Sequence, residues 1–496
     1  MLQPPSEDPR EVLRQLVLRQ TETEARLHRV ENSLLFRALR WAGNKVGYRP
    51  GGDSDQDYQK WVEQRGWFDP PSADGEPATW QPIARLTAAN AAEWRTALCR
   101  VQSEYCAVVP TDVRLSPRAE CRWNELLRDR QFDAVYSDWD HIDASGRPHS
   151  PRFTPGFSPG LLRHSGYWGA CFVVRTSLLR EIGQDTDPSQ PGWTHTLTRR
   201  AGTAAATVGR IPHILWHSAN SPAAIESPAA TVAGDPSQAS IVICTRTPKL
   251  AERCLHLLRA SDAAQAEIVV VAHDCEMASG SGTTIVRYSG QFHYGLINEL
   301  GVARTTRPVV VLLNDDVEPI APDWLSALTG ALRDDSVGIA GGLLLYPDGS
   351  VQHAGISVGG RTTPAHLGRG QISSKWWPWL RVTREVAAVT GACMAMRRTV
   401  WDELGGFDRR FPVNYNDVDL CLRARRAGYS AILESAAVLR HREAQTRTTA
   451  VMPAELKILS SLWARELTVT DPFFNPNLEL PDERIVLAPP LYTNLT

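Results

Sequence analysis

The chain has 496 residues, of which 43% are apolar and 22% charged, and its formal net charge at pH 7 is -2. This length is typical of about three domains, and the apolar fraction is that of an ordinary globular protein. The near-zero charge gives no reason to expect nucleic-acid binding. Nine cysteines without a CxxC pair favour buried thiols over disulfides or a zinc site. With neither a signal-peptide pattern nor an apolar run of membrane-spanning length, we expect a cytoplasmic protein.

Residues 1–50 are predicted to contain one long charged helix. Between Leu34 and Lys45 its apolar residues alternate with basic ones, which is the pattern of a basic amphipathic helix. Two interpretations stay open: peripheral contact with the inner face of the plasma membrane, or packing against the protein itself or a dimer partner. Residues 51–80 are polar and rich in proline and glycine, which is typical of a linker that docks on a domain.

Two α/β segments follow, at 81–220 and 240–470, with a linker of low hydrophobicity at 221–239. In the second segment, short apolar strands alternate with helices of about ten residues, which predicts a doubly wound, mostly parallel sheet. Ligands of such sheets bind beyond the carboxyl ends of the strands. Residues 471–496 are predicted to form a C-terminal tail.

The segment 81–220 repeats the pattern of the later segment in a shortened form. An apolar strand followed by an acidic turn occurs in both, and the turn contains Asp112 in the first and Asp316 in the second. Thr194 stands in the first segment where the second has Asp417. We therefore expect a shortened α/β copy that lacks the acids of its neighbour.

The strongest candidate site begins where the apolar run Val309–Leu313 ends in Asn314, Asp315 and Asp316. Such a run predicts a strand buried on both faces, and its carboxyl end would open onto the ligand crevice. Mg²⁺ or Mn²⁺ binds a few oxygen ligands together with substrate phosphates, so this turn suits a sugar diphosphate. The alternative is an acidic turn that caps the following helix.

A second acidic pair, Asp417 and Asp419, lies just ahead of the helix predicted at Leu420–Ala427. One carboxylate in such a place can act as a general base, whereas the alternative is a cap that complements the helix dipole. His441 ends an apolar strand and could complete a metal shell, although a single histidine is more often structural. Gly391-Ala392 supplies small residues where the backbone must approach a substrate closely.

Residues 240–447 resemble the family 2 glycosyltransferases of GT-A fold, especially those that assemble bacterial surface polysaccharides. The resemblance rests on ordered motifs: Ile241–Arg246, Glu267–Val271, Leu313–Glu318, Leu345–Gly355, Thr383–Glu385, Val389–Cys393, Gly405–Asp408, Asn416–Arg423 and, in the tail, Asp471–Leu478.

This resemblance implies an inverting transfer from a nucleotide-diphosphate sugar to a hydroxyl of a growing glycan or lipid-linked glycan. It implies Asp417 as the base, Asp316 and His441 as ligands of a Mn²⁺ or Mg²⁺ cofactor, and Gly391, Ala392 and Asp419 on the acceptor side. It places Thr245, Arg246, Asp274, Asn298 and Asp315 on the nucleotide or donor side.

Three positions depart from the family pattern. Ala272 stands where an aspartate usually contacts the nucleoside, so Asp274 is the expected substitute. Asn314 replaces the first acid of the metal motif, which leaves more of the metal binding to Asp316. Arg442 follows His441 in place of the usual small polar residue.

The resemblance extends to the first segment, which looks like the back part of a GT-A domain. We expect it to be inactive and to hold acceptor glycan or brace the active domain, although Asp138 and Asp140 keep a second active site open. Two other functions remain as alternatives for the chain: a non-catalytic glycan-binding scaffold, and a sugar nucleotidyltransferase. The lack of a glycine-rich phosphate loop after the first strand argues against the nucleotidyltransferase.

Overall fold

A computed structural model describes residues 54–65, 83–219, 232–278, 282–360, 362–442 and 453–488. The helix predicted within 1–50, with its membrane or dimer contact, lies outside these residues, as does most of the linkers at 51–80 and 221–239. The contacts group Asp53–Thr496 into one compact unit. The predicted domain boundaries inside this unit stay predictions.

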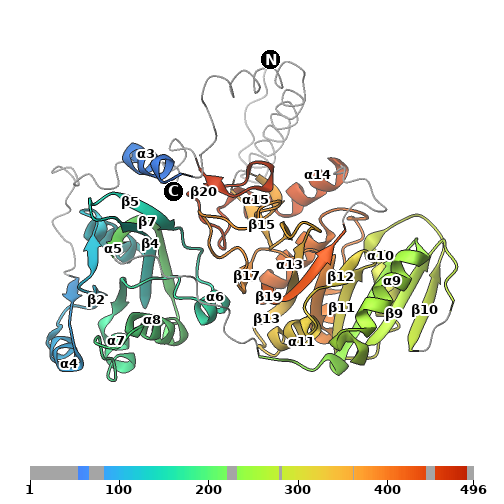
Figure 1. Ribbon diagram of the computed structural model, residues 1–496, viewed down its shortest axis with the longest axis horizontal. Coiled ribbons are helices and arrows are strands. Elements are labelled where there is room, and N and C mark those ends of the chain that lie inside the picture. Colours follow the sequence, from blue (N-terminus) through green and yellow to red (C-terminus); the bar gives the residue numbers. More distant parts are fainter. Residues whose placement is uncertain are drawn as a thin grey trace, which may run out of the picture. The chain divides into compact units, whose positions relative to one another are not determined.

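The later half is built on a sheet of ten strands among the described residues (Figure 1). Its main path runs in the order β10-β9-β8-β11-β18-β13-β19-β12, with β14 paired to β13 and β17 paired to β19. The strands are β8 (Ala239–Thr245), β9 (Glu267–His273), β10 (Thr283–Tyr288), β11 (Val309–Asn314), β12 (Val317–Pro319), β13 (Val337–Leu345), β14 (Val351–His353), β17 (Arg384–Val386), β18 (Cys393–Arg397) and β19 (Ser430–His441).

Strands β10, β9, β8 and β11 are parallel, as are β13 and β19, whereas β18 runs antiparallel to both of its neighbours. The strands β8, β9 and β11 are buried on both faces, and their sequences accordingly consist mostly of valine, isoleucine and leucine. The helices of this half are α9 (Pro248–Arg259), α10 (Tyr294–Val302), α11 (Trp324–Ala331), α12 (Arg398–Leu404) and α13 (Asn416–Arg426). This arrangement confirms the predicted α/β class and the parallel core from β10 to β11, whereas the sheet as a whole is mixed, with four parallel and five antiparallel strand pairs among the described residues.

The earlier half has a seven-stranded sheet among its described residues, in the order β1-β2-β6-β4-β7-β3, with β5 paired to β4. Its strands are β1 (Ala84–Leu86), β2 (Tyr105–Val108), β3 (Val113–Leu115), β4 (Ala134–Ile142), β5 (Pro148–Arg152), β6 (Phe172–Arg175) and β7 (Val208–Ser218). Its helices are α4 (Ala91–Arg100), α5 (Ala119–Asp129), α6 (Pro159–His164), α7 (Thr176–Ile182) and α8 (Trp193–Ala204).

The two sheets share one topology. The path β1-β2-β6-β4-β7-β3 matches β8-β11-β18-β13-β19-β12 strand for strand, and each neighbouring pair has the same parallel or antiparallel sense. The hairpin partners β5 and β14 also correspond. Counterparts of β9, β10 and β17 are absent from the described part of the earlier half. The predicted shortened copy is therefore confirmed at the level of strand order.

The remaining elements are α3 (Asp55–Arg65), α14 (Pro453–Leu462), α15 (Ala464–Thr468) and the hairpins β15 (Ile356–Gly359) with β16 (Thr362–His366) and β20 (Leu478–Glu479) with β21 (Val486–Leu487). Residues after α15 contact the earlier half. Asn475 and Asn477 donate amide hydrogens to the buried Asp138, at 2.9 and 3.0 Å. A second contact between the halves involves α6, where the backbone amide of Gly160 donates to the Glu385 carboxylate at 3.0 Å.

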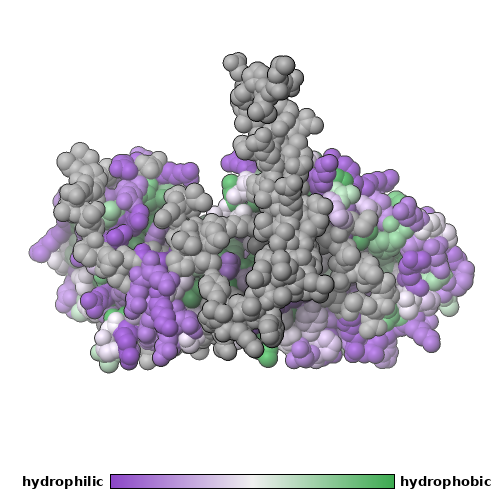
Figure 2. All heavy atoms as spheres, turned by 90° about the horizontal axis from the view of Figure 1, so that it is seen from above, coloured by the Kyte–Doolittle hydropathy of each residue, from purple (hydrophilic) through white to green (hydrophobic). Residues whose placement is uncertain are grey.

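The face in Figure 2 is mostly hydrophilic wherever residues are described, with small hydrophobic areas between. The large apolar side chains that are most exposed, Val232, Ile320, Ile372 and Val469, come from separate segments. Among the described helices, none is long and apolar enough to cross a membrane.

Candidate active site

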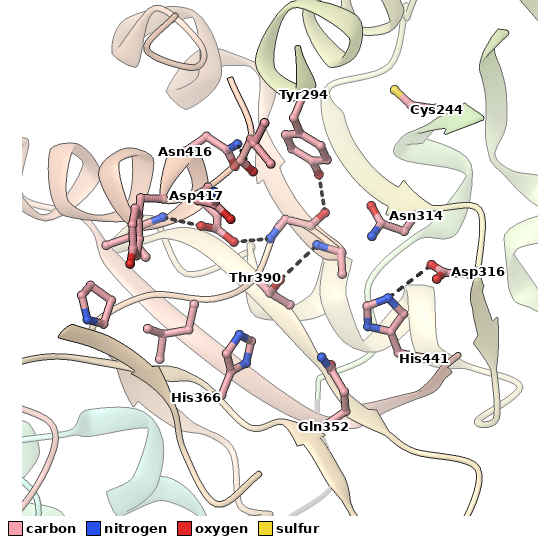
Figure 3. A pocket seen from close by; sticks show the side chains of 18 of the residues that line it. Cys244, Tyr294, Asn314, Asp316, Gln352, His366, Thr390, Asn416, Asp417 and His441 are labelled. Atoms are coloured by element: carbon pink, nitrogen blue, oxygen red, sulfur yellow. Dashed lines mark hydrogen bonds and ion pairs between the residues drawn. The ribbon is translucent and has the colours of Figure 1, made fainter. Parts of the chain in front are cut away.

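A pocket of about 350 Å³ opens beside the carboxyl ends of β8 and β11, where a doubly wound sheet binds its ligands. Its volume lies within the range of small-molecule sites. Asp316 and Asp417, about a hundred positions apart in the sequence, both line it, and Figure 3 shows them on opposite sides. Of the predicted site residues, the lining includes Asp315, Asp316, Gly391, Ala392, Asp417 and His441.

Asp316 and His441 form one side of the pocket. They meet because β12 pairs with the end of β19, with Val317 opposite His441. His441 Nε2 lies 3.2 Å from Asp316 Oδ1, and both side chains are about nine-tenths buried. A carboxylate and an imidazole that face one pocket are suitable ligands for Mn²⁺ or Mg²⁺. No group of three or more ligand-type side chains occurs among the described residues, so a cation held here would need substrate oxygens to complete its shell.

Asp315 turns away from this pair towards β8. The hydroxyl of Thr245 donates to Asp315 Oδ2 at 2.7 Å. Burial raises the pKa of the Asp315 carboxyl to about 6, and the neighbouring charge of Asp316 adds to the effect. Thr245 therefore acts on the site through Asp315 and does not itself line the pocket.

Asp417 occupies the second position of α13, which begins at Asn416 and so starts four residues earlier than predicted. Asp417 Oδ2 accepts from the Gly391 amide at 3.0 Å, and Oδ1 accepts from the Val418 amide at 2.8 Å. The helix follows Tyr415, which has a φ of 60° in the left-handed region. Such a backbone persists only where its surroundings hold it.

Two contacts hold this part of the pocket. Glu455 on α14 accepts the amide hydrogens of Val413 and Asn414, at 2.7 and 2.9 Å, and so fixes the chain just before Tyr415. A Cβ atom on Gly391 would lie 2.7 Å from the Tyr294 hydroxyl, which itself donates to the Gly391 carbonyl at 2.7 Å. Glycine is therefore required at this close approach, as the sequence suggested.

The segment Gly391-Ala392 also connects the two acidic sides. The backbone amide of Asn314 donates to the Ala392 carbonyl at 3.0 Å, while the backbone amide of Gly391 donates to the Asp417 carboxylate. One short stretch of backbone thus spaces the acidic turn after β11 from the start of α13.

Asp419, assigned to the acceptor side, lies outside the pocket lining and is 2% exposed. Its carboxylate accepts from Arg423 Nε at 2.8 Å and from Trp463 Nε1 at 2.9 Å. These contacts fit the alternative interpretation, a structural acid at a helix start. We therefore correct its assignment to a structural one.

The remaining donor-side residues also lie outside the lining. Arg246 and Asp274 form a partly exposed ion pair of 3.7 Å after β8 and β9, at the predicted nucleotide edge. Asn298 is buried behind the pocket, where it accepts from the Cys244 thiol and donates to the Tyr294 carbonyl at 2.9 Å. Because Cys244 and Tyr294 line the pocket, Asn298 supports its wall rather than facing a ligand.

Sequence reasoning missed several lining residues. Gln352 and His366 line the pocket, and so do Arg369 and Glu483, which form an ion pair of 3.0 Å. Gln352 stands inside the quoted motif Leu345–Gly355, so the signal was present without a role attached to it.

His353 supports the pocket from behind. Burial lowers its pKa well below the usual value. Its Nε2 is 3.3 Å from the Thr390 and Gly355 amide nitrogens, and its Nδ1 is 3.0 Å from Nδ1 of His366. The neutral ring accepts at Nε2 and donates at Nδ1, so it positions Thr390 and the pocket-lining His366.

The acids of the earlier half are sealed inside the protein. Asp138 and Asp140 are 0% exposed, and burial raises the pKa of both. Asp138 accepts from Thr154, Asn475 and Asn477, while Asp140 accepts from the Tyr58 hydroxyl at 2.7 Å and pairs with His217. These contacts are structural, so the hypothesis of a second active site at these acids is wrong.

Comparison with known proteins identifies a family that the later half matches. Residues 236–467 match the family described as glycosyltransferase like family 2. An O-antigen biosynthesis protein, RfbC, of Myxococcus xanthus is 28% identical over 441 residues, which are 77% of this chain and 34% of that protein. An uncharacterized protein of Sinorhizobium fredii is 35% identical over 216 residues, 42% of this chain and 24% of that protein.

An N-acetylglucosaminyl-diphospho-decaprenol L-rhamnosyltransferase of Mycobacterium tuberculosis is 29% identical over 175 residues, 29% of this chain and 55% of that protein. The chain spans less than two thirds of the length of each of these relatives. The match covers the whole later sheet and every residue that lines the acidic pocket except Glu483. Residues 236–467 of this chain are therefore a glycosyltransferase domain of the family 2 type.

Proposed function

We propose that the chain is a metal-dependent, inverting glycosyltransferase that moves a sugar from a nucleotide-diphosphate donor to a hydroxyl of a glycan or lipid-linked glycan. The observation that carries this proposal is the presence of Asp316 and Asp417 on opposite sides of one pocket in a family 2 domain. An acid beside an imidazole suits the diphosphate, and a separate acid suits the incoming hydroxyl.

Asp316 and His441 would hold a Mn²⁺ or Mg²⁺ cofactor at the donor diphosphate. A bound divalent cation neutralises the charge that grows on the leaving diphosphate. Thr245 holds Asp315 towards the end of β8, where its carboxylate would contact the donor. The Arg246–Asp274 pair at the ends of β8 and β9 would contact the nucleotide.

Asp417 would act as the general base. Its two oxygens accept from backbone amides of Gly391 and Val418, which hold the carboxylate in one orientation while it still lines the pocket. It would remove the acceptor proton as the acceptor oxygen attacks the anomeric carbon from the face opposite the diphosphate. The fixed spacing between its helix and the acidic turn would hold donor and acceptor in line.

The acceptor is proposed from the relatives. One is named for O-antigen biosynthesis, and another transfers rhamnose to an N-acetylglucosaminyl-diphospho-decaprenol. Both names concern glycans of the cell envelope, which supports a glycan or lipid-linked glycan acceptor for this chain. The earlier half, whose acids are buried, would brace the active half or hold the acceptor. Peripheral membrane contact or dimerisation through residues 1–50 stays a prediction.

A donor screen tests the proposal. The purified chain is incubated with Mn²⁺, a panel of UDP-, dTDP- and GDP-sugars, and aryl glycosides as acceptors. Acceptor-dependent release of nucleoside diphosphate is the expected result. Release of pyrophosphate would instead point to a nucleotidyltransferase, and binding without turnover across the panel would point to a glycan-binding scaffold.

A further inference from the structure

Gln352 has an amide group that lacks hydrogen-bond partners among the described residues. The residue is 3% exposed, yet its Oε1 is buried without a partner, and neither amide atom bonds to another described group. Most buried polar side chains in proteins have a hydrogen-bond partner, so a buried amide without one needs a specific explanation. Gln352 also lines the acidic pocket, which makes a ligand the natural partner.

The strand register places this amide close to the donor side. On β13, Leu345 pairs with Val351 of β14 on one side and with Arg440 of β19 on the other. Gln352 and His441 are the next residues after these two partners, so they flank the same end of β13. In Figure 3 Gln352 lies between His366 and His441 on the side of the pocket that faces Asp417. A sugar that extends from a diphosphate at His441 towards Asp417 would pass over this amide.

We propose that the Gln352 amide binds hydroxyl groups of the transferred sugar and so selects the donor by its hydroxyl pattern, an inference that rests on the proposed function. Nε2 donates to the oxygen of one hydroxyl, and a rotation of the amide about its last side-chain torsion turns the buried Oε1 to accept from a neighbouring hydroxyl. The amide is neutral and offers both a donor and an acceptor, which suits a pair of sugar hydroxyls better than a phosphate.

The earlier half supports this assignment by contrast. Strand β5, the counterpart of β14, has the sequence Pro-His-Ser-Pro-Arg and carries no amide side chain. An open buried amide is therefore not required by the shared sheet topology. It occurs in the half whose acids face a pocket.

The test is a thermodynamic cycle in which one substitution in the protein is combined with the removal of single hydroxyl groups from the donor. Gln352→Met keeps the length of the side chain and removes both polar atoms. The exposed Gln265→Met, outside the pocket lining, is the matched control. Both variants are measured with the best donor of the screen, with its deoxy and deoxyfluoro analogues at each hydroxyl, and with the nucleoside diphosphate alone. Turnover gives kcat/KM, and ligand-observed NMR gives donor affinity without any need for turnover.

We expect Gln352→Met to lower kcat/KM and affinity for the full donor about 10- to 100-fold, because a sugar hydroxyl loses its partner. The loss should shrink to about twofold or less for the one or two analogues that lack the bound hydroxyl. Nucleoside diphosphate affinity and the melting temperature should not fall, since the amide makes no hydrogen bond within the described residues and methionine fills the same space. Gln265→Met should behave as the wild type throughout.

An equal loss with every deoxy donor, no loss at all, or a marked fall in melting temperature would overturn the role of Gln352. A loss that depends on hydroxyls of the acceptor instead of the donor would also overturn it. Failure of the proposed function has a different signature, in which the wild type binds nucleotide sugars with the predicted Gln352 dependence but transfers none of them.

Discussion

In the later half, helix α13 follows Tyr415 at a φ of 60°, and in the earlier half helix α8 follows Gly192 at a φ of 71°. The second residue of α13 is Asp417, and the second residue of α8 is Thr194. The two halves thus keep the same strand order and the same left-handed turn into this helix. They differ in the side chain that the turn presents. The scaffold is common to both, whereas the chemistry depends on single positions at its turns.

Buried acids show the same contrast. Asp138 and Asp140 lie on β4 of the earlier half and are fully enclosed by hydrogen-bond donors, whereas Asp316 lies in a turn and faces a pocket. An aspartate at the end of a strand can therefore hold a fold together or bind a ligand. Its partners, rather than its residue type, decide which.

Asp417→Asn should have the largest effect on transfer. The amide keeps the size of the side chain but cannot take a proton, so we expect kcat to fall about 10²–10⁴-fold while donor affinity changes little. Kinetics and donor titration of the purified variant check this. Thr194→Ala at the equivalent position is the control and should retain full activity. If Asp417→Asn transfers as well as the wild type, the base is another group.

Asp316→Ala and His441→Ala should come next. Either change removes one of the two proposed metal ligands, so we expect a loss of about 10²–10³-fold in kcat/KM and a higher Mn²⁺ requirement. Treatment with EDTA followed by Mn²⁺ titration measures the second effect. Asp112→Ala in the corresponding turn of the earlier half should leave the Mn²⁺ titration curve unchanged. If Asp112→Ala raised the Mn²⁺ requirement as much as Asp316→Ala, metal binding could not be assigned to the later half alone.

Asp138→Ala should affect stability rather than chemistry. It removes the acceptor of the Thr154 hydroxyl and one of the acceptors of the Asn475 and Asn477 amides, all of them buried, which should lower the free energy of unfolding by about 3 kcal/mol. Denaturant unfolding measures this loss. The activity of the folded fraction should stay within about twofold of the wild type. A large loss of kcat at unchanged stability would revive a catalytic role for the earlier half.

Asp315→Asn should change stability in the opposite direction, and the change should depend on pH. Folding raises the pKa of this carboxyl to about 6, so its contribution to stability is present below the pKa of the unfolded chain and is lost as pH rises through about 6. The amide stays neutral. We therefore expect the variant to gain up to about 3 kcal/mol over the wild type between pH 4 and pH 6 and to keep that advantage above pH 6. If the melting temperatures of the variant and the wild type changed in parallel across this pH range, the raised pKa of Asp315 would be contradicted.

Much of the later fold could be predicted because its central strands are buried on both faces. The runs in β8, β9 and β11 have few polar positions, so their ends stand out where Thr245 and Asn314 appear. The acidic pocket could be predicted for the same reason, since parallel strands bring their carboxyl ends to one edge. The repeat between the halves was visible because both use the same succession of strand, turn and helix.

Other features depend on contacts that no local pattern reveals. Asp419 is buried because Trp463, 44 residues later, donates to it, and Asp138 is enclosed by asparagines more than 300 residues away. The start of α13 was missed because a tyrosine in the left-handed region gives no sequence signal, unlike the glycine before α8. The proposed role of Gln352 depends on the lack of a hydrogen-bond partner for its buried amide oxygen, which only the folded structure reveals.

The central claim is that Asp417 takes the acceptor proton on one side of the anomeric carbon while the diphosphate at Asp316 and His441 leaves from the other. The anomeric configuration of the glycoside product, read by ¹H NMR, tests this directly. The account predicts inversion relative to the donor. Retention of configuration would contradict it, because a single displacement across this pocket cannot give that product.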